Sequence, residues 1–143
     1  MSNITIPIRS LAESGVEVLR RDATGSVSLP RNSRIEAPSS LKWTTYEHSL
    51  SLGAFSYQVS GYCFAARIGR YCSFGEQVQI GRQNHPLTWA STSPAFYLFE
   101  GLFDVGTGFN GAEEFGRYRF EHSEPPTRVK ITTIGNDVWI GHG

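Results

Sequence analysis

The chain has 143 residues, of which 39% are hydrophobic and 18% charged, and its formal net charge at pH 7 is zero. This length fits one domain, and the composition excludes an intrinsically disordered chain. The zero net charge leaves no basic surplus for nucleic acid or an anionic membrane, and no apolar run approaches the roughly 18 residues of a membrane span. The N-terminus also lacks the charged-then-apolar order of a signal peptide. We therefore expect a cytoplasmic protein whose partners include neither nucleic acid nor a membrane.

Residues 1–34 form an N-terminal segment without a repeat. Ser10 to Glu13 fit one helical turn, and a short strand is expected to start near Val16. The run Pro30-Arg31-Asn32-Ser33 is typical of a turn.

The chain's two cysteines, Cys63 and Cys72, each stand beside an aromatic residue. In a cytoplasmic protein, this favours small buried thiols over a disulfide or a metal pair.

From the middle of the chain onward, an apolar residue followed by glycine recurs at a step of six residues. The pairs are Ile68-Gly69, Phe74-Gly75 and Ile80-Gly81 and, after a gap, Ile134-Gly135 and Ile140-Gly141. This period fits neither an amphipathic helix, with a period of about 3.6, nor an alternating strand, with a period of about 2. It is typical of a parallel β-helix, in which the apolar residue points into a narrow core and glycine permits a tight corner. The alternative is an ordinary sandwich with frequent glycine turns.

Between the two blocks of the repeat lies a segment of about residues 86–128. It holds nine of the chain's 18 aromatic residues. Loops longer than about 15 residues are usually functional or disordered, and the aromatic content disfavours disorder. We expect an inserted loop that walls an apolar binding cleft. The alternative is that it covers the core of the repeats or packs on a neighbouring subunit.

Several segments follow one another in an order that resembles a known family. They are residues 68–75 (IGRYCSFG), 80–81 (IG), 84–86 (NHP), 89–94 (WASTSP) and 134–141 (IGNDVWIG). Together they resemble the hexapeptide-repeat acyltransferases, specifically the xenobiotic (chloramphenicol and streptogramin) acetyltransferase branch, over about residues 50–143.

This resemblance implies an all-β fold, a left-handed parallel β-helix with a long inserted loop. We expect a single domain over residues 1–143, comprising the non-repeat segment 1–34, the repeats and the loop 86–128. The resemblance further implies a homotrimer with sites between subunits and acetyl-CoA as the donor. Members of the family continue past the Gly-His-Gly that ends this chain, so we expect a C-terminally truncated member that lacks the later coils, which puts its activity and its binding of CoA in question.

His85 is the predicted catalytic residue. Moving an acetyl group from a thioester to a hydroxyl needs a base for the hydroxyl proton, and imidazole titrates near neutrality. The resemblance implies the same role, because the matching histidine is the family's catalytic base. The expected function is therefore an acetyl-CoA-dependent O-acetyltransferase acting on a small molecule such as an antibiotic or a sugar. We expect direct transfer, without an acetyl-enzyme and without a metal.

Four further residues near this histidine are predicted to shape the acceptor site or orient the imidazole: Asn84, Trp89, Ser91 and Ser93. The alternative is a capped turn that merely holds the loop. Trp139 and Gly141 match the family segment that lines the donor side, where glycine lets the pantetheine arm approach the backbone. Trp139 alternatively packs at a trimer face.

Two other functions stay open. Parallel β-helices also host the gamma-type carbonic anhydrases, which bind zinc through three histidines, and this chain has His48, His85, His122 and His142. The position of His122 outside the repeat argues against this zinc hydratase. The second alternative is a non-catalytic assembly module that uses the β-helix as a trimeric platform.

Overall fold

The computed structural model describes residues 3–19, 25–82, 84–97, 110–111, 113–114 and 129–143. The chain divides into two compact units. The first comprises Met1–Arg82 with Lys130–Gly143, and the second comprises Gln83–Val129. The second unit spans the segment predicted as an inserted loop. Within the described ranges, no helix is long and apolar enough to cross a membrane.

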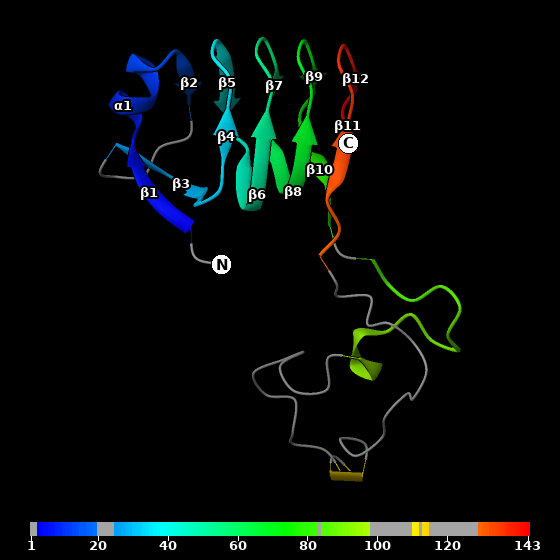
Figure 1. The fold of residues 1–143 in the computed structure, drawn as a ribbon. Coiled ribbons are helices and arrows are strands. Elements are labelled where there is room, and N and C mark those ends of the chain that lie inside the picture. The colour runs from blue at the N-terminus through cyan, green and yellow to red at the C-terminus, as the bar shows by residue number, and fades with distance from the viewer. Residues whose placement is uncertain (1–2, 20–24, 83, 98–109, 112, 115–128) are drawn as a thin grey trace. The chain divides into compact units, whose positions relative to one another are not determined.

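Short strands dominate the first unit (Figure 1). Its elements are β1 Asn3–Pro7, α1 Ile8–Glu13, β2 Val16–Val18, β3 Ser26–Pro30, β4 Arg34–Ile35, β5 Ser39–Lys42, β6 Thr45–Leu52, β7 Tyr57–Gln58, β8 Gly61–Ile68, β9 Ser73–Phe74, β10 Val78–Ile80, β11 Thr132–Ile134 and β12 Trp139–Ile140. The second unit contains the 3-10 helix η1, Pro94–Phe96. The helical turn and the strand predicted for the N-terminal segment are confirmed by α1 and β2.

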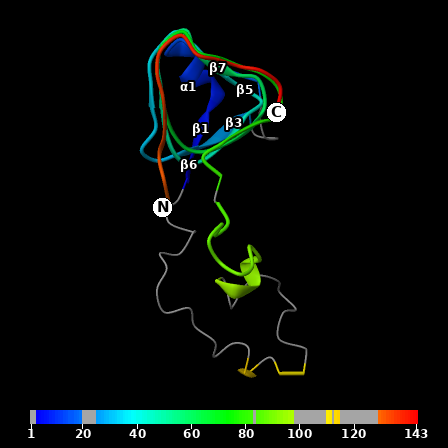
Figure 2. The same ribbon diagram turned by 90° about the vertical axis from the view of Figure 1, so that its right-hand side faces the viewer.

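Two five-stranded parallel sheets carry most of the first unit. One has the order β10-β8-β6-β4, with β11 also paired to β8, and the other has the order β12-β9-β7-β5-β2. From β5 to β10 the chain alternates between these sheets, so each strand pairs with the one two places later in sequence. We call one pass the stretch of chain that runs through a strand of each parallel sheet. Figure 2 shows that successive passes of the first unit overlie one another around a three-sided outline.

The fold class predicted from the sequence, an all-β left-handed parallel β-helix, is wrong. A left-handed β-helix is not shown. The described strands fall into two parallel sheets and one antiparallel sheet, β1 with β3, and α1 lies between β1 and β2 in the chain. The described part is strand-rich with mixed sheets, which is closer to an α/β class. The physical reason is that a six-residue period only requires an apolar side chain to return to the same side, and it constrains neither handedness nor residues 1–34.

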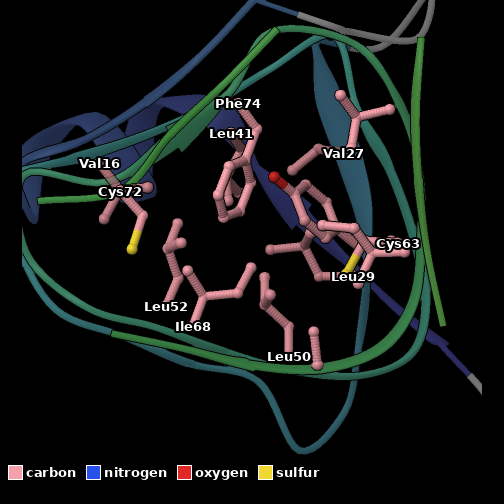
Figure 3. Close-up of a cluster of buried hydrophobic side chains, with 14 residues drawn as sticks. Val16, Val27, Leu29, Leu41, Leu50, Leu52, Cys63, Ile68, Cys72 and Phe74 are labelled. Atoms are coloured by element: carbon pink, nitrogen blue, oxygen red, sulfur yellow. The ribbon is translucent and has the colours of Figure 1, made fainter. Parts of the chain in front are cut away.

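The core of the first unit lies between the sheets (Figure 3). Its buried apolar residues are Val16, Val27, Leu29, Leu41, Tyr46, Leu50, Leu52, Cys63, Ala66, Ile68, Cys72, Phe74, Val78 and Ile80. Three of them, Ile68, Phe74 and Ile80, are the first residues of successive hexapeptides, and each is at most 4% exposed. The prediction that this place points inward is therefore confirmed for these three.

At Gly69, the glycine is required for space and not for its dihedral freedom. A Cβ atom on Gly69 would overlap the side-chain oxygen of Asn136 and lie 2.6 Å from the carbonyl oxygen of Gly135. After Gly69 and Gly135, the left-handed backbone conformation falls two residues later, at Tyr71 (φ 63°) and Asp137 (φ 57°), whereas Gly81 is itself left-handed (φ 68°). The predicted glycine corner is therefore confirmed at Gly81, and at Gly69 the close approach of the next segment explains the glycine.

Candidate functional site

The predicted base, His85, lies in the second unit with an exposed side chain. Its Nδ1 atom is 2.9 Å from the backbone carbonyl oxygen of Thr92 and 2.9 Å from the hydroxyl oxygen of Tyr97. The rings of His85 and Tyr97 meet nearly edge-on, at 69° with centroids 6.3 Å apart.

The Thr92 contact selects one protonation form of the neutral imidazole. A carbonyl oxygen only accepts hydrogen bonds, so a 2.9 Å contact is favourable only when Nδ1 of His85 carries the hydrogen. The lone pair of the neutral ring then resides on Nε2. This is the arrangement that a general base requires, with one ring nitrogen held by the protein and the other free to take a proton.

The four predicted acceptor-side residues lie in the same described stretch, residues 84–97. Asn84 is exposed, and within that stretch no hydrogen bond joins its side chain to His85. The Ser91 hydroxyl accepts the backbone N–H of Ser93 at 3.1 Å. The Trp89 ring meets Tyr97 edge-on, at 81° with centroids 6.1 Å apart. Three of the four residues therefore take part in holding the turn and its aromatic side chain, whereas Asn84 does not.

The two predicted donor-side residues lie in the first unit. Trp139 begins β12, pairs in register with Ser73 of β9, and is 79% exposed. Gly141 follows β12, and a Cβ atom there would be 3.7 Å from the Trp139 ring. Next to them, Nδ1 of His142 contacts the Glu76 carboxylate. The donor-side and acceptor-side residues thus belong to different units.

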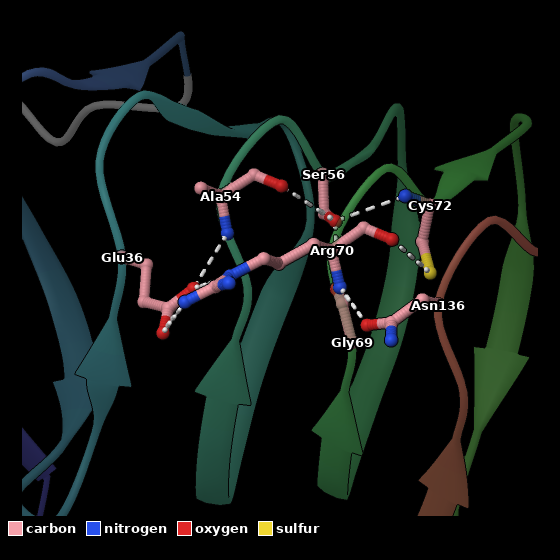
Figure 4. A network of polar contacts seen from close by, with 7 residues as sticks. All are labelled: Glu36, Ala54, Ser56, Gly69, Arg70, Cys72 and Asn136. Atoms are coloured by element: carbon pink, nitrogen blue, oxygen red, sulfur yellow. Dashed lines mark hydrogen bonds and ion pairs between the residues drawn. The ribbon is translucent and has the colours of Figure 1, made fainter.

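A polar network fixes one corner of the parallel sheets (Figure 4). The Ser56 hydroxyl, 1% exposed, donates to the Gly69 carbonyl at 2.8 Å and accepts the Cys72 N–H at 2.9 Å. The Asn136 side-chain oxygen accepts the Arg70 N–H at 2.8 Å. These contacts were not predicted from the sequence, because the partners are up to 66 positions apart and no local signal joins them.

Both cysteines are buried and free, which confirms the prediction of buried thiols. Burial raises the pKa of the Cys63 thiol to about 12. The Cys72 thiol donates to the Gly135 carbonyl at 3.1 Å. A buried, protonated thiol is a poor nucleophile.

Two histidines of the zinc alternative have other neighbours in the described part of the first unit. His48 lies on β6 against the Phe64 ring at 5.2 Å, and His142 contacts Glu76. Among the residues that the structure describes, no group of three histidine, cysteine or acidic side chains is placed to hold a metal ion. His122 lies outside the described residues.

The two atoms that contact the base, the Thr92 carbonyl and the Tyr97 hydroxyl, were also missed. Every residue has a carbonyl, so nothing in the sequence singles out Thr92. Tyr97 was visible only as one of many aromatic residues in this segment. The sequence signal that could have identified this partner is a tyrosine twelve residues after the candidate base.

Comparison of the chain with protein-family models, curated proteins and solved structures finds no match.

Proposed function

We propose that the chain is an acyltransferase that moves the acetyl group of acetyl-CoA to a hydroxyl group of a small molecule, with His85 as the general base. The observation that carries this proposal is the contact between Nδ1 of His85 and the Thr92 carbonyl. It leaves Nε2, on an exposed ring, as the proton acceptor. The motif resemblance around Asn84-His85-Pro86 supplies the reaction class.

The step balances without another reagent. The acceptor hydroxyl oxygen attacks the thioester carbonyl carbon, and its proton passes to Nε2 of His85. The tetrahedral intermediate then collapses, the carbon–sulfur bond breaks, and the leaving thiolate takes the proton back from the imidazolium. The Thr92 carbonyl accepts the Nδ1 hydrogen throughout and stabilises the transient cation.

Donor binding in this proposal involves Trp139 and Gly141. The indole of Trp139 is 79% exposed and therefore accessible to a ligand or a second subunit. Gly141 has no side chain between a ligand and the backbone amides after β12. The proposal includes a homotrimer with sites between subunits. The acceptor class is a hydroxyl-bearing antibiotic or sugar.

Release of free CoA thiol with a panel of hydroxyl acceptors tests the proposal. The variants are His85→Gln and, as the matched control, His48→Gln, which changes a histidine of β6 that the proposal does not use. General base catalysis contributes about 10²- to 10⁴-fold, so His85→Gln should lose about that factor in kcat while His48→Gln keeps most of it. Equal rates for His85→Gln and the unmodified chain would rule out the base assignment.

One observation favours a second candidate, a non-catalytic assembly module. Four aromatic side chains in the described part of the first unit are more than half exposed: Trp43, Phe55, Tyr71 and Trp139. Exposed aromatic side chains are enriched at protein interfaces. A chain that forms oligomers in sedimentation but shows no acetyl-CoA binding in calorimetry would favour this module over the transferase.

A further inference from the structure

The hydroxyl of Tyr97 contacts the same imidazole nitrogen as the Thr92 carbonyl. Both oxygen atoms lie 2.9 Å from Nδ1 of His85. The amino-acid sequence does not distinguish Tyr97 from the other aromatic residues of its segment, and the proposed acetyl transfer uses only the carbonyl. The second contact therefore needs its own explanation.

Local hydrogen bonds fix the position of the phenol. The backbone N–H of Tyr97 donates to the Pro94 carbonyl at 3.1 Å, and the N–H of Phe96 donates to the Ser93 carbonyl at 3.2 Å. Ser91 in turn holds the N–H of Ser93 at 3.1 Å. These bonds form the short helix η1 and place Tyr97 at its end.

Trp89 restrains the same phenol from the side. Its ring packs edge-on against the Tyr97 ring, with centroids 6.1 Å apart and an interplanar angle of 81°. An edge-to-face arrangement of this kind is a favoured geometry for aromatic pairs. Three predicted acceptor-side residues thus converge on the placement of Tyr97: Trp89, Ser91 and Ser93.

The chemistry of the shared nitrogen decides what Tyr97 does there. The Thr92 carbonyl requires the hydrogen on Nδ1, so the phenol oxygen accepts a share of that hydrogen and cannot donate to the nitrogen. Two acceptors on Nδ1–H favour the tautomer with a free Nε2. They also oppose rotation of the ring, because rotation would break both contacts.

We propose that Tyr97 is a positioning residue for His85, because its phenol oxygen and the Thr92 carbonyl together hold Nδ1–H and leave Nε2 as the free nitrogen. Its catalytic consequence rests on the proposed acetyl transfer. The contact itself does not, since the tautomer of His85 is measurable without turnover. The inference gives a function to the turn from Ser91 to Tyr97, namely to place an oxygen atom beside the base.

The test is the two-bond ¹H–¹⁵N spectrum of the histidine rings in the full chain, with His85→Gln assigning the His85 signals. The variant is Tyr97→Phe, which keeps the ring and removes the oxygen. Tyr71→Phe is the matched control, because it removes the hydroxyl of an exposed tyrosine that stacks on Phe55 in the other unit. We expect Nδ1–H to dominate in the unmodified chain and in Tyr71→Phe.

In Tyr97→Phe, the ratio of Nδ1–H to Nε2–H should fall about three- to tenfold, which is the effect of losing one hydrogen bond. Where acetyl transfer is measured, kcat should fall in proportion to the lost fraction of the Nδ1–H tautomer, with KM for acetyl-CoA unchanged. An unchanged ratio in Tyr97→Phe, or a higher share of Nδ1–H, would overturn the positioning role. A shifted ratio in a chain without acetyl transfer would support the contact and count against the proposed function alone.

Discussion

The carboxylate of Glu36 accepts two hydrogen bonds from the guanidinium of Arg70, at Oε2 from Nε (2.7 Å) and at Oε1 from Nη2 (3.1 Å). The same Oε2 accepts the backbone N–H of Ala54 at 3.1 Å. These three residues come from three successive passes of the chain at one corner, so a single carboxylate joins all three (Figure 4). The hydrogen bonds from Arg70 and then from Ala54 hold the pKa of Glu36 below its usual range.

This pair predicts an acid-sensitive contribution to stability. Because the folded-state pKa of Glu36 is lowered, its contribution is complete above the ordinary value of 4.5 and is lost as the pH falls through the lowered folded-state pKa. Glu36→Gln should therefore lower the free energy of unfolding at pH 7 and have a smaller effect at pH 3. Urea unfolding at both pH values measures this. Glu47→Gln, at an exposed acid of β6, is the control, and an equal loss for both variants at pH 7 would contradict the role of the pair.

The two glycines of equivalent Ile-Gly pairs should respond differently to alanine. Gly69→Ala places a Cβ atom against Asn136 and the backbone of Gly135, whereas a Cβ atom on Gly135 meets nothing within 4 Å. Overpacking of this kind costs about 1–3 kcal/mol, so Gly69→Ala should be destabilised by that amount. Gly135→Ala should unfold close to the unmodified chain. Chemical denaturation measures the free energy of unfolding of both variants. Equal stability would show that close stacking does not explain the glycine at position 69.

A pair of leucines tests where the core lies. Leu41 is 1% exposed and Leu87 is 88% exposed. Leu41→Ala removes buried methyl groups and should cost about 2–5 kcal/mol of unfolding free energy, whereas Leu87→Ala should cost almost nothing. Both variants make the same chemical change, so their difference in urea midpoint isolates burial. Similar midpoints would mean that Leu41 is not part of a packed core.

The thiols of Cys63 and Cys72 should not react with thiol reagents in the folded chain. Both have no exposed surface, and the pKa of Cys63 is raised to about 12. At pH 8 a thiol-reactive dye should therefore label neither residue until urea unfolds the chain, and then label both. The labelling curve should follow the unfolding curve seen by fluorescence. Rapid labelling without urea would contradict the burial of these side chains.

The sequence predicted which residues are buried better than it predicted the architecture. The inward places Ile68, Phe74 and Ile80 follow from a period that needs only local residues. The predicted turn at Pro30–Ser33 is present as well, with the Ser33 N–H donating to the Pro30 carbonyl at 3.0 Å. The fold class was wrong, because the period does not constrain handedness and because the antiparallel pair β1–β3 and the helix α1 lie in the segment that has no period.

The candidate site was predictable only in part, for a related reason. His85 was predicted as the base from the chemistry of its side chain, which follows from the residue type alone. Its partners are a backbone carbonyl and a phenol that a turn brings near the imidazole. The residue types alone do not determine the geometry of that turn. Glu36 and Arg70, 34 residues apart, likewise become partners only through the register of the sheets.

The most direct test of the proposed acetyl-CoA dependence is thermal unfolding of the chain with and without millimolar acetyl-CoA. This measurement requires no knowledge of the acceptor. ATP at the same concentration is the control for a nonspecific nucleotide effect. Acetyl-CoA at about 100 times its dissociation constant should stabilise the folded state by about 2.7 kcal/mol. We expect a clear rise in Tm with acetyl-CoA, equally large in His85→Gln because the base does not bind the donor, and none with ATP. An unchanged Tm in acetyl-CoA would contradict the assignment of an acetyl-CoA-dependent transferase.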